Sequence, residues 1–338
     1  MINVTVVLLH GNFASTTIGP LEVFYAAGLL WNTLQGQPPD ARFRLRMASV
    51  RGEPVESAYH LGLVPETSIE AIEATDLIVV PALGLDFDGS FARHRDLFPW
   101  LRHHAAKGAY VAAVCTGAAY LAEAGLLDGR EATTHWATAD ALRARFPKVK
   151  WCPDKLITED RRVLCSGGVY ASIDLSLYLV RKFCGHEIAL QTAKSMVLDM
   201  PRACQSAYAV LPLSRPHDDE AIRRAEAFIE NHFRKPLIVE ELAREHHMSE
   251  RNFIRRFKAA TGRTPGNYLQ ATRISVAKHM LESGARSMQA VGEAVGYEDG
   301  AFFRALFRRE TGLTPAQYRE RFGGQHPALP RQVAEQRS

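Results

Sequence analysis

Apolar runs alternate with amphipathic stretches along the first 200 residues. Runs typical of buried strands cover residues 4–9, 76–81 and 110–115, with further strand candidates at 43–50 and 162–166. Helical periodicity lies between them, near residues 21–34, 93–107, 118–124, 139–146 and 173–183. This alternation predicts an α/β domain with a flavodoxin-like parallel sheet and helices on both of its faces.

The pattern changes after residue 210. A segment with two prolines and no periodicity, residues 211–217, is typical of a linker, and every recognisable segment from Asp219 onward is helical. We therefore expect an α/β domain over residues 1–205, a linker over 206–218, an all-α domain over 219–323 and a flexible tail over 324–338.

The all-α region contains an internal repeat. A shift of 50 residues places seven residues on identical ones, namely Phe253, Phe257, Thr261, Gly262, Thr264, Pro265 and Tyr268 on Phe303, Phe307, Thr311, Gly312, Thr314, Pro315 and Tyr318. In each copy the glycine ends one helix and Thr-Pro begins the next. A short helical segment precedes each copy, at residues 239–246 and 288–295. A short helix, a tight turn and a second helix form a helix-turn-helix motif, so the sequence predicts two.

The second helix of each motif carries polar and basic residues away from the phenylalanines. Ser249 and Asp299 are the predicted N-caps of these helices. The candidate DNA-binding residues are Ser249, Arg251, Asn252, Arg255, Arg304 and Arg308. Guanidinium groups bind phosphates and guanine edges, so we expect double-stranded DNA as a partner. Packed helical hairpins without such a role are the alternative, which two copies in register disfavour.

Charge supports this expectation. Residues 219–323 carry 18 Lys/Arg and 14 Asp/Glu, an excess of four that equals the formal net charge of +4 of the whole chain. The Thr-Gly-x-Thr-Pro-x-x-Tyr ending of both copies resembles the AraC/XylS family over residues 219–322. The resemblance implies recognition helices in successive major grooves. Residues 264–283 would span roughly 30 Å as a helix, close to the ~34 Å of one DNA turn. One departure from the family pattern is Ala305 in the second copy, because the equivalent residue of the first copy is Arg255.

A cysteine in the first domain stands where a strand turns into a helix. Residues 111–114 are apolar, and Cys115-Thr116-Gly117 followed by alanines is typical of a nucleophile elbow. A thiol at a helix N-terminus is expected to have a lowered pKa. We expect His135, and Glu22 at a strand-to-helix transition after Gly19-Pro20, to converge with it at the carboxyl edge of the sheet. The alternatives are a buried packing cysteine and a structural histidine.

Several segments resemble the PfpI/ThiJ-like (class I glutamine-amidotransferase-like) superfamily. They are the Cys115 elbow and residues 19–24, 76–81, 124–130, 133–136, 166–168 and 173–174. Joined to an AraC-type end, they resemble the GlxA subfamily of regulators. The resemblance implies a transcriptional regulator, an activator rather than a repressor, and not an enzyme. The alternative is a Cys-dependent hydrolase or hydratase with an appended DNA-binding module.

The same resemblance implies further partners. Glu22, Cys115, Thr116, His135 and Trp136 would bind a small effector, an amino acid or a quaternary amine. A homodimer through the N-terminal domain and, for an activator, contact with RNA polymerase are also expected.

Composition excludes other classes of protein. The first residues lack the basic region and cleavage site typical of a signal peptide, so we expect none, and no apolar stretch reaches the ~20 residues of a membrane span. Five cysteines without a CxxC pair argue against a disulfide framework and against structural zinc. We therefore expect a cytoplasmic protein with no metal, no cofactor and no membrane partner.

Overall fold

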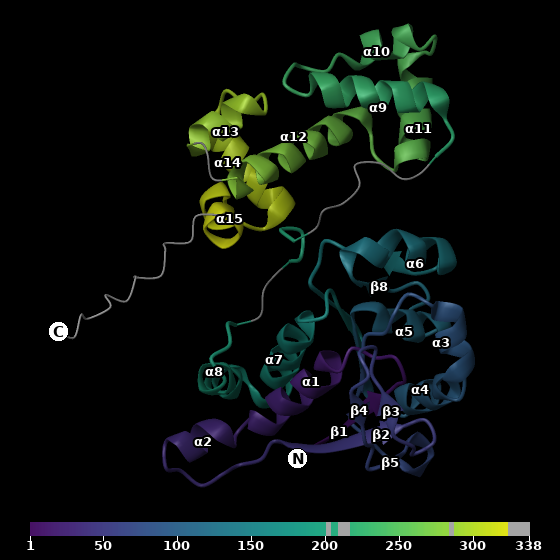
Figure 1. Ribbon diagram of the computed structural model, residues 1–338, viewed down its shortest axis with the longest axis vertical. Coiled ribbons are helices and arrows are strands. Elements are labelled where there is room, and N and C mark those ends of the chain that lie inside the picture. Colours follow the sequence, from purple (N-terminus) through teal and green to yellow (C-terminus); the bar gives the residue numbers. More distant parts are fainter. Residues whose placement is uncertain (201–203, 209–216, 284–286, 324–338) are drawn as a thin grey trace, which may run out of the picture. The chain divides into compact units, whose positions relative to one another are not determined.

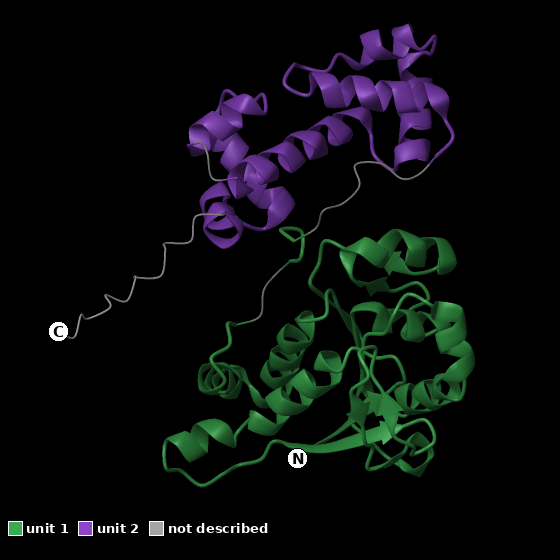
Figure 2. Ribbon diagram, viewed as in Figure 1, with its two compact units in different colours: residues 1–209 green, residues 210–338 purple. Residues whose placement is uncertain are grey.

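The computed structural model describes residues 1–200, 204–208, 217–283 and 287–323. The chain divides into unit 1, Met1–Ala209, and unit 2, Val210–Ser338 (Figure 2). Most of the predicted linker and the predicted tail lie outside the described residues. None of the described helices is long and apolar enough to cross a lipid bilayer.

Unit 1 is built around a seven-stranded sheet with the order β10-β11-β7-β6-β1-β2-β5. Its strands are β1 (Ile2–Leu8), β2 (Phe43–Ser49), β5 (Thr67–Ser68), β6 (Leu77–Val80), β7 (Tyr110–Val114), β10 (Ile157–Asp160) and β11 (Val163–Ser166). All neighbours are parallel except β10 and β11. The chain moves from β1 to β2 on one side and then to β6, β7 and β11 on the other, which confirms the flavodoxin-like arrangement. Edge strand β10 was not predicted.

Helices cover both faces of this sheet (Figure 1). One core lies beneath α3 (Phe87–Arg93), α4 (Leu97–Ala106), α5 (Ala118–Glu123) and α6 (Ala139–Arg145). The other lies beneath α1 (Ser15–Ala26), α7 (Ala171–Cys184) and α8 (His186–Ser195). Successive strand residues point to opposite faces, so Ile78 and Val80 enter the first core while Leu77 and Val79 enter the second.

Short elements lie outside the main sheet. Strands β3 (Val55–Glu56) and β4 (Gly62–Leu63) form an antiparallel hairpin, and β8 (Glu131–Ala132) pairs in parallel with β9 (Lys150–Trp151). Helix α2 (Leu30–Leu34) follows α1.

Two predicted helices have different boundaries in the structure. The stretch 21–34 is divided between α1 and α2, because Gly28 has φ +78° and an added Cβ would lie 2.0 Å from the carbonyl oxygen of Asp40. Helix α1 also begins at Ser15, so Pro20 lies inside it rather than at its start. The stretch 93–107 contains only α4, since the chain turns at His94 after the unpredicted α3. Helix α8 was not predicted either.

Unit 2 is entirely helical in its described part, as predicted. Its helices are α9 (Glu220–His232), α10 (Val239–Glu245), α11 (Glu250–Thr261), α12 (Pro265–Glu282), α13 (Met288–Ala294), α14 (Gly300–Thr311) and α15 (Pro315–Phe322). Helices α10 and α11 form the first helix-turn-helix motif, and α13 and α14 form the second. Helix α12 connects them, and its 18 residues give it a length of about 27 Å.

The internal repeat is also a repeat of contacts. Gly262 and Gly312 end α11 and α14 in the left-handed conformation, with φ +81° and +77°. The rings of Phe257 and Tyr268 lie 5.4 Å apart at 85°, and those of Phe307 and Tyr318 lie 5.4 Å apart at 84°. Thr264 and Thr314 cap the following helices through their side chains. Identical residues therefore build two equivalent cores.

Candidate functional site

Helix α11 separates its basic residues from its aromatic ones. Arg251 and Arg255 are exposed, whereas Phe253 and Phe257 are fully buried. A guanidinium nitrogen of Arg255 donates to Oδ1 of Asn252 at 2.9 Å, which orients both side chains. The helix therefore presents a polar and cationic face to solvent.

Helix α14 presents a different surface at the equivalent positions. Arg304 and Arg308 are exposed and have no ion-pair partner among the described residues. Ala305 stands where Arg255 stands in α11, and Phe302 takes the place of Asn252 with 53% of its surface exposed. An exposed phenylalanine there was not singled out from the sequence, although the 50-residue shift aligns it with Asn252.

The predicted N-caps differ in outcome. The side chain of Asp299 accepts hydrogen bonds from the backbone N–H groups of Ala301 and Phe302, as predicted. Ser249 occupies the N-cap position of α11, but its hydroxyl makes no capping bond. The predicted N-cap position of Ser249 is therefore confirmed, without the side-chain hydrogen bond that usually accompanies it. The exposed hydroxyl of Ser249 therefore does not contribute to capping α11.

Arg273 on α12 joins the segment between α9 and α10 to the second helix-turn-helix motif and was not found from the sequence. Its side chain is 9% exposed, and its guanidinium donates to the carbonyl oxygens of Phe233 at 2.7 Å, Lys235 at 3.0 Å and Gly296 at 3.2 Å. It also lies 4.9 Å from the ring centre of Tyr297. The first two acceptors precede the first motif, and Gly296 and Tyr297 form the turn of the second. Arg273 thus fixes the α9–α10 connection and the turn of the second motif to α12.

In unit 1 the predicted elbow is present. Cys115 follows β7 directly, has φ +54°, and begins the short turn that leads into α5. Positive φ at a non-glycine residue is strained and is a feature of functional elbows. Gly117 permits the turn, because an added Cβ would lie 2.5 Å from the carbonyl oxygen of Pro81.

The predicted lowering of the thiol pKa is wrong. Cys115 is 5% exposed, and burial raises the pKa of its thiol to about 11, against the opposing effect of hydrogen bonds from Thr116 and from the backbone of His135. The cost of burying a thiolate exceeds the stabilisation by these hydrogen bonds. The resting group is therefore a neutral thiol.

The segment carrying His135 lies against the elbow. Thr134 Oγ1 donates to the carbonyl oxygen of Cys115 at 3.0 Å. His135 is half-buried, its Nδ1 accepts from the N–H of Ala137 at 3.1 Å, and burial lowers the pKa of its imidazole. The ring of Trp136 is centred 5.1 Å from it. The backbone of residues 134–135 thus contacts Cys115, and the rings of His135 and Trp136 lie next to each other.

The remaining two predicted residues are placed differently. The Thr116 hydroxyl donates to the carbonyl of Leu83 at 2.6 Å and accepts from its N–H at 2.9 Å, so it holds the loop after β6. Glu22 lies inside α1 and is exposed, without a hydrogen bond or ion pair to the described residues. Helix α1 starts five residues before Pro20, so Glu22 lies in its second half rather than at its start, and the convergence of Glu22 with Cys115 stays a prediction.

Residues 3–182, more than half of the chain, match the DJ-1/PfpI family. The chain belongs to the DJ-1/PfpI family. Residues 242–321 match the helix-turn-helix domain, and this part is of AraC type, as the repeat predicted. The DJ-1/PfpI fold is shared with DJ-1beta of Drosophila melanogaster, which has a TM-score of 0.50, 20% identity, and coverage of 59% of this chain and 98% of that one.

Two relatives of the chain have different functions in their names. The HTH-type transcriptional regulator CdhR of Pseudomonas aeruginosa is 29% identical over 278 residues, which cover 82% of each chain. The isonitrile hydratase of Pseudomonas putida is 36% identical over 137 residues, which cover 40% of this chain and 58% of the hydratase. A relative matched over both parts of the chain is thus named a regulator, while an enzyme matches over a shorter stretch.

Gln205 links the DJ-1/PfpI domain to the chain that leads toward unit 2. Its Nε2 lies 2.8 Å from the carbonyl oxygen of Thr134 and 3.2 Å from that of Lys155, while its Oε1 is buried without a partner among the described residues. Gly167 makes room for it, since an added Cβ would lie 2.6 Å from Oε1. Gln205 lies beyond the matched residues 3–182, so no motif pointed to it.

Proposed function

We propose that this protein is a sequence-specific DNA-binding transcriptional regulator whose DJ-1/PfpI domain responds to a small-molecule effector. The observation that carries the proposal is the duplicated helix-turn-helix motif, with a buried aromatic core and exposed arginines on both second helices. A structural helical hairpin needs the core but not the arginines. The name of the relative that covers both parts, a transcriptional regulator, supports the same function.

In this proposal α11 and α14 each enter a major groove. Arg251 and Arg255 on α11 are suited to phosphates and guanine edges, and Asn252 to adenine. Arg304 and Arg308 supply cations on α14, where the exposed Phe302 is suited to a thymine methyl group. The first helix would read polar base edges and the second an A·T-rich segment.

The effector site we propose consists of Cys115, Thr116, His135 and Trp136. Burial raises the pKa of the Cys115 thiol to about 11, and a neutral thiol favours binding over nucleophilic catalysis. The half-buried indole of Trp136 suits an effector with an ammonium group, such as an amino acid or a quaternary amine. We also propose that the protein forms a homodimer through unit 1 and, as an activator, contacts RNA polymerase.

A second candidate function is Cys-dependent hydration or hydrolysis. The positive φ of Cys115 and the similarity to isonitrile hydratase favour it. Against it stands the thiol pKa of about 11, which leaves only about one thiolate in 10⁴ at pH 7. Turnover of isonitriles or amides that a Cys115→Ala variant abolishes would establish this second function.

The experiment that tests the main proposal compares two fragments. We expect residues 217–323 to bind DNA fragments selected from random sequence by the full chain, with an affinity that falls steeply as salt increases, because bound arginines release counterions from phosphates. The fragment 1–208 serves as the control. Equal DNA binding by the two fragments, or no salt dependence, would contradict the proposal.

The exposed arginines supply the matched variants. Arg255→Ala is expected to weaken specific binding by about 1–3 kcal/mol if its guanidinium contacts a base. Exposed Arg244 on α10 pairs with Glu240 at 2.9 Å and lies outside the second helix of the motif, so Arg244→Ala is the control. Equal losses for both variants would show that α11 is not the recognition helix.

A further inference from the structure

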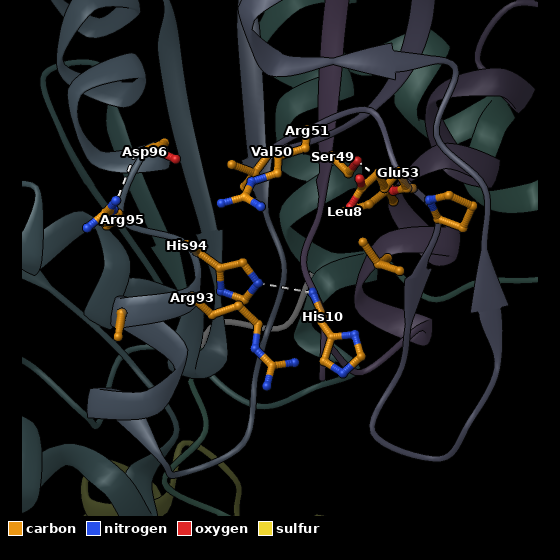
Figure 3. Close-up of a pocket in the computed structure, with 13 residues that line it drawn as sticks. Leu8, His10, Ser49, Val50, Arg51, Glu53, Arg93, His94, Arg95 and Asp96 are labelled. Carbon is orange, nitrogen blue, oxygen red and sulfur yellow. Dashed lines mark hydrogen bonds and ion pairs between the residues drawn. The ribbon is translucent and has the colours of Figure 1, made fainter.

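A cavity of about 480 Å³ lies at the carboxyl ends of β1 and β2. Its walls come from residues 49–51 and 53–55 after β2, from residues 92–96 at the turn between α3 and α4, and from Leu8 and His10 at the end of β1 (Figure 3). Neither Cys115 nor His135 lines it, so it is separate from the effector site proposed above. Open α/β sheets bind ligands at this edge, and the volume suits a small molecule.

Two arginines face this cavity without a carboxylate partner. Arg51 follows β2 and Arg93 ends α3, and neither forms an ion pair with any residue that the structure describes. Arg95 also lines the cavity, but it pairs with Asp96 at 3.8 Å and is 80% exposed. Like charges around one cavity repel each other, and an anion between them removes this repulsion. The planar guanidinium matches a carboxylate in two parallel hydrogen bonds.

The elements that carry the two arginines are held in place. Beside Arg93, the ring of His94 is 4% exposed, accepts a hydrogen bond from the backbone N–H of His10 at 3.2 Å, and lies 3.0 Å from the Tyr120 hydroxyl. Burial lowers its pKa to about 4, so the ring stays neutral. Near Arg51, the hydroxyl of Ser49 donates to the carbonyl of Glu53 at 2.7 Å. The backbone around the cavity is therefore held in place, whereas the side chains of Arg51 and Arg93 are exposed.

The charges around the cavity limit the charge of the anion that it can bind. Three arginines and two carboxylates, those of Glu53 and Asp96, give its lining a formal charge of +1. This balance favours a single carboxylate over a polyphosphate, which would repel Glu53 and Asp96. We propose that the cavity binds a small organic monocarboxylate, with its carboxylate group between Arg51 and Arg93. The proposal does not depend on DNA binding.

The test is calorimetric titration of the full chain with straight-chain and branched monocarboxylates of two to six carbons. The primary amide of each acid and inorganic phosphate are titrated at the same ionic strength. We expect at least one carboxylate to bind, and its amide to bind at least tenfold more weakly, since the amide lacks the charge. This comparison uses only the wild-type protein and does not depend on how variants fold.

Variants locate the binding site. Arg51→Gln and Arg93→Gln are each expected to weaken carboxylate binding at least tenfold, whereas Arg46→Gln, at an exposed position of β2 outside the cavity, leaves it unchanged. Binding of phosphate alone, absence of carboxylate binding, or carboxylate affinity unchanged by both cavity variants would overturn the proposal. DNA binding of the same preparations reports separately on the function proposed above.

Discussion

Arg273 gives the sharpest prediction about unit 2, because its one side chain connects the segment before the first helix-turn-helix motif to the turn of the second. Replacement by alanine removes three hydrogen bonds to the carbonyl groups of Phe233, Lys235 and Gly296 and a contact with the ring of Tyr297. Lys235 is exposed, and Phe233 and Gly296 are partly exposed. Water can therefore hydrogen-bond to some of the carbonyl groups that lose the guanidinium donor. A net value of about 1 kcal/mol for each hydrogen bond and about 1 kcal/mol for the ring contact lowers the free energy of unfolding by about 4 kcal/mol.

The assay is urea unfolding of the fragment 217–323, followed by circular dichroism. With a denaturant slope of about 1.5 kcal/mol/M, a loss of about 4 kcal/mol lowers the urea midpoint by roughly 2.7 M. Arg273→Lys keeps the charge but not the planar fork, so it is expected to recover less than half of the loss. Exposed Arg251→Ala is the control and should change stability by less than about 0.5 kcal/mol. A loss below about 1 kcal/mol for Arg273→Ala would refute the reasoning.

Three further predictions concern unit 1. Cys115 should react with iodoacetamide at pH 7 more slowly than half-buried Cys152, because burial raises the Cys115 pKa to about 11; faster labelling of Cys115, read by mass spectrometry of peptides, would contradict this. Burial lowers the pKa of His94 to about 4 in the folded protein, whereas in the unfolded chain the pKa is about 6.5. As pH falls from about 6.5 to 4, the unfolded chain takes up a proton that the folded protein does not. The free energy of unfolding therefore falls by up to about 3 kcal/mol over this range. In His94→Asn this part of the pH dependence should disappear from unfolding curves, and an unchanged pH profile would count against the burial argument. Gln205→Ala should leave DNA affinity of the ligand-free protein unchanged and reduce the effect of effector on it, since Gln205 contacts Thr134 next to His135; an unchanged effector response measured by fluorescence anisotropy would rule out this connection.

The sequence was most informative where the same local signals occur twice. Glycine at the end of a helix and Thr-Pro at the start of the next are local rules, and they located α11, α12, α14 and α15 within about a residue. The Cys115 elbow was also visible, because small residues after a buried strand leave few alternatives. These features depend on neighbours in the chain, which a sequence displays directly.

Features that depend on distant neighbours were not visible. The thiol pKa depends on how deeply Cys115 is buried, which the helix N-terminus alone does not reveal. Arg273 has the same appearance in the sequence as an arginine that contacts DNA, yet its partners lie 23 to 40 residues away. Pro20 suggested a helix start, but a proline in the second turn of α1 removes only one backbone hydrogen bond.

In the proposed complex, one chain places two recognition helices on one side of DNA. The most direct measurement is hydroxyl-radical footprinting of the full chain on DNA fragments that it selects from random sequence. Because α12 is about 27 Å long, the account predicts two protected segments about one helical turn apart on the same face of the duplex. Arg255→Ala should weaken one segment and a double Arg304→Ala, Arg308→Ala variant the other. A single protected segment, or protection unaffected by these variants, would contradict the account.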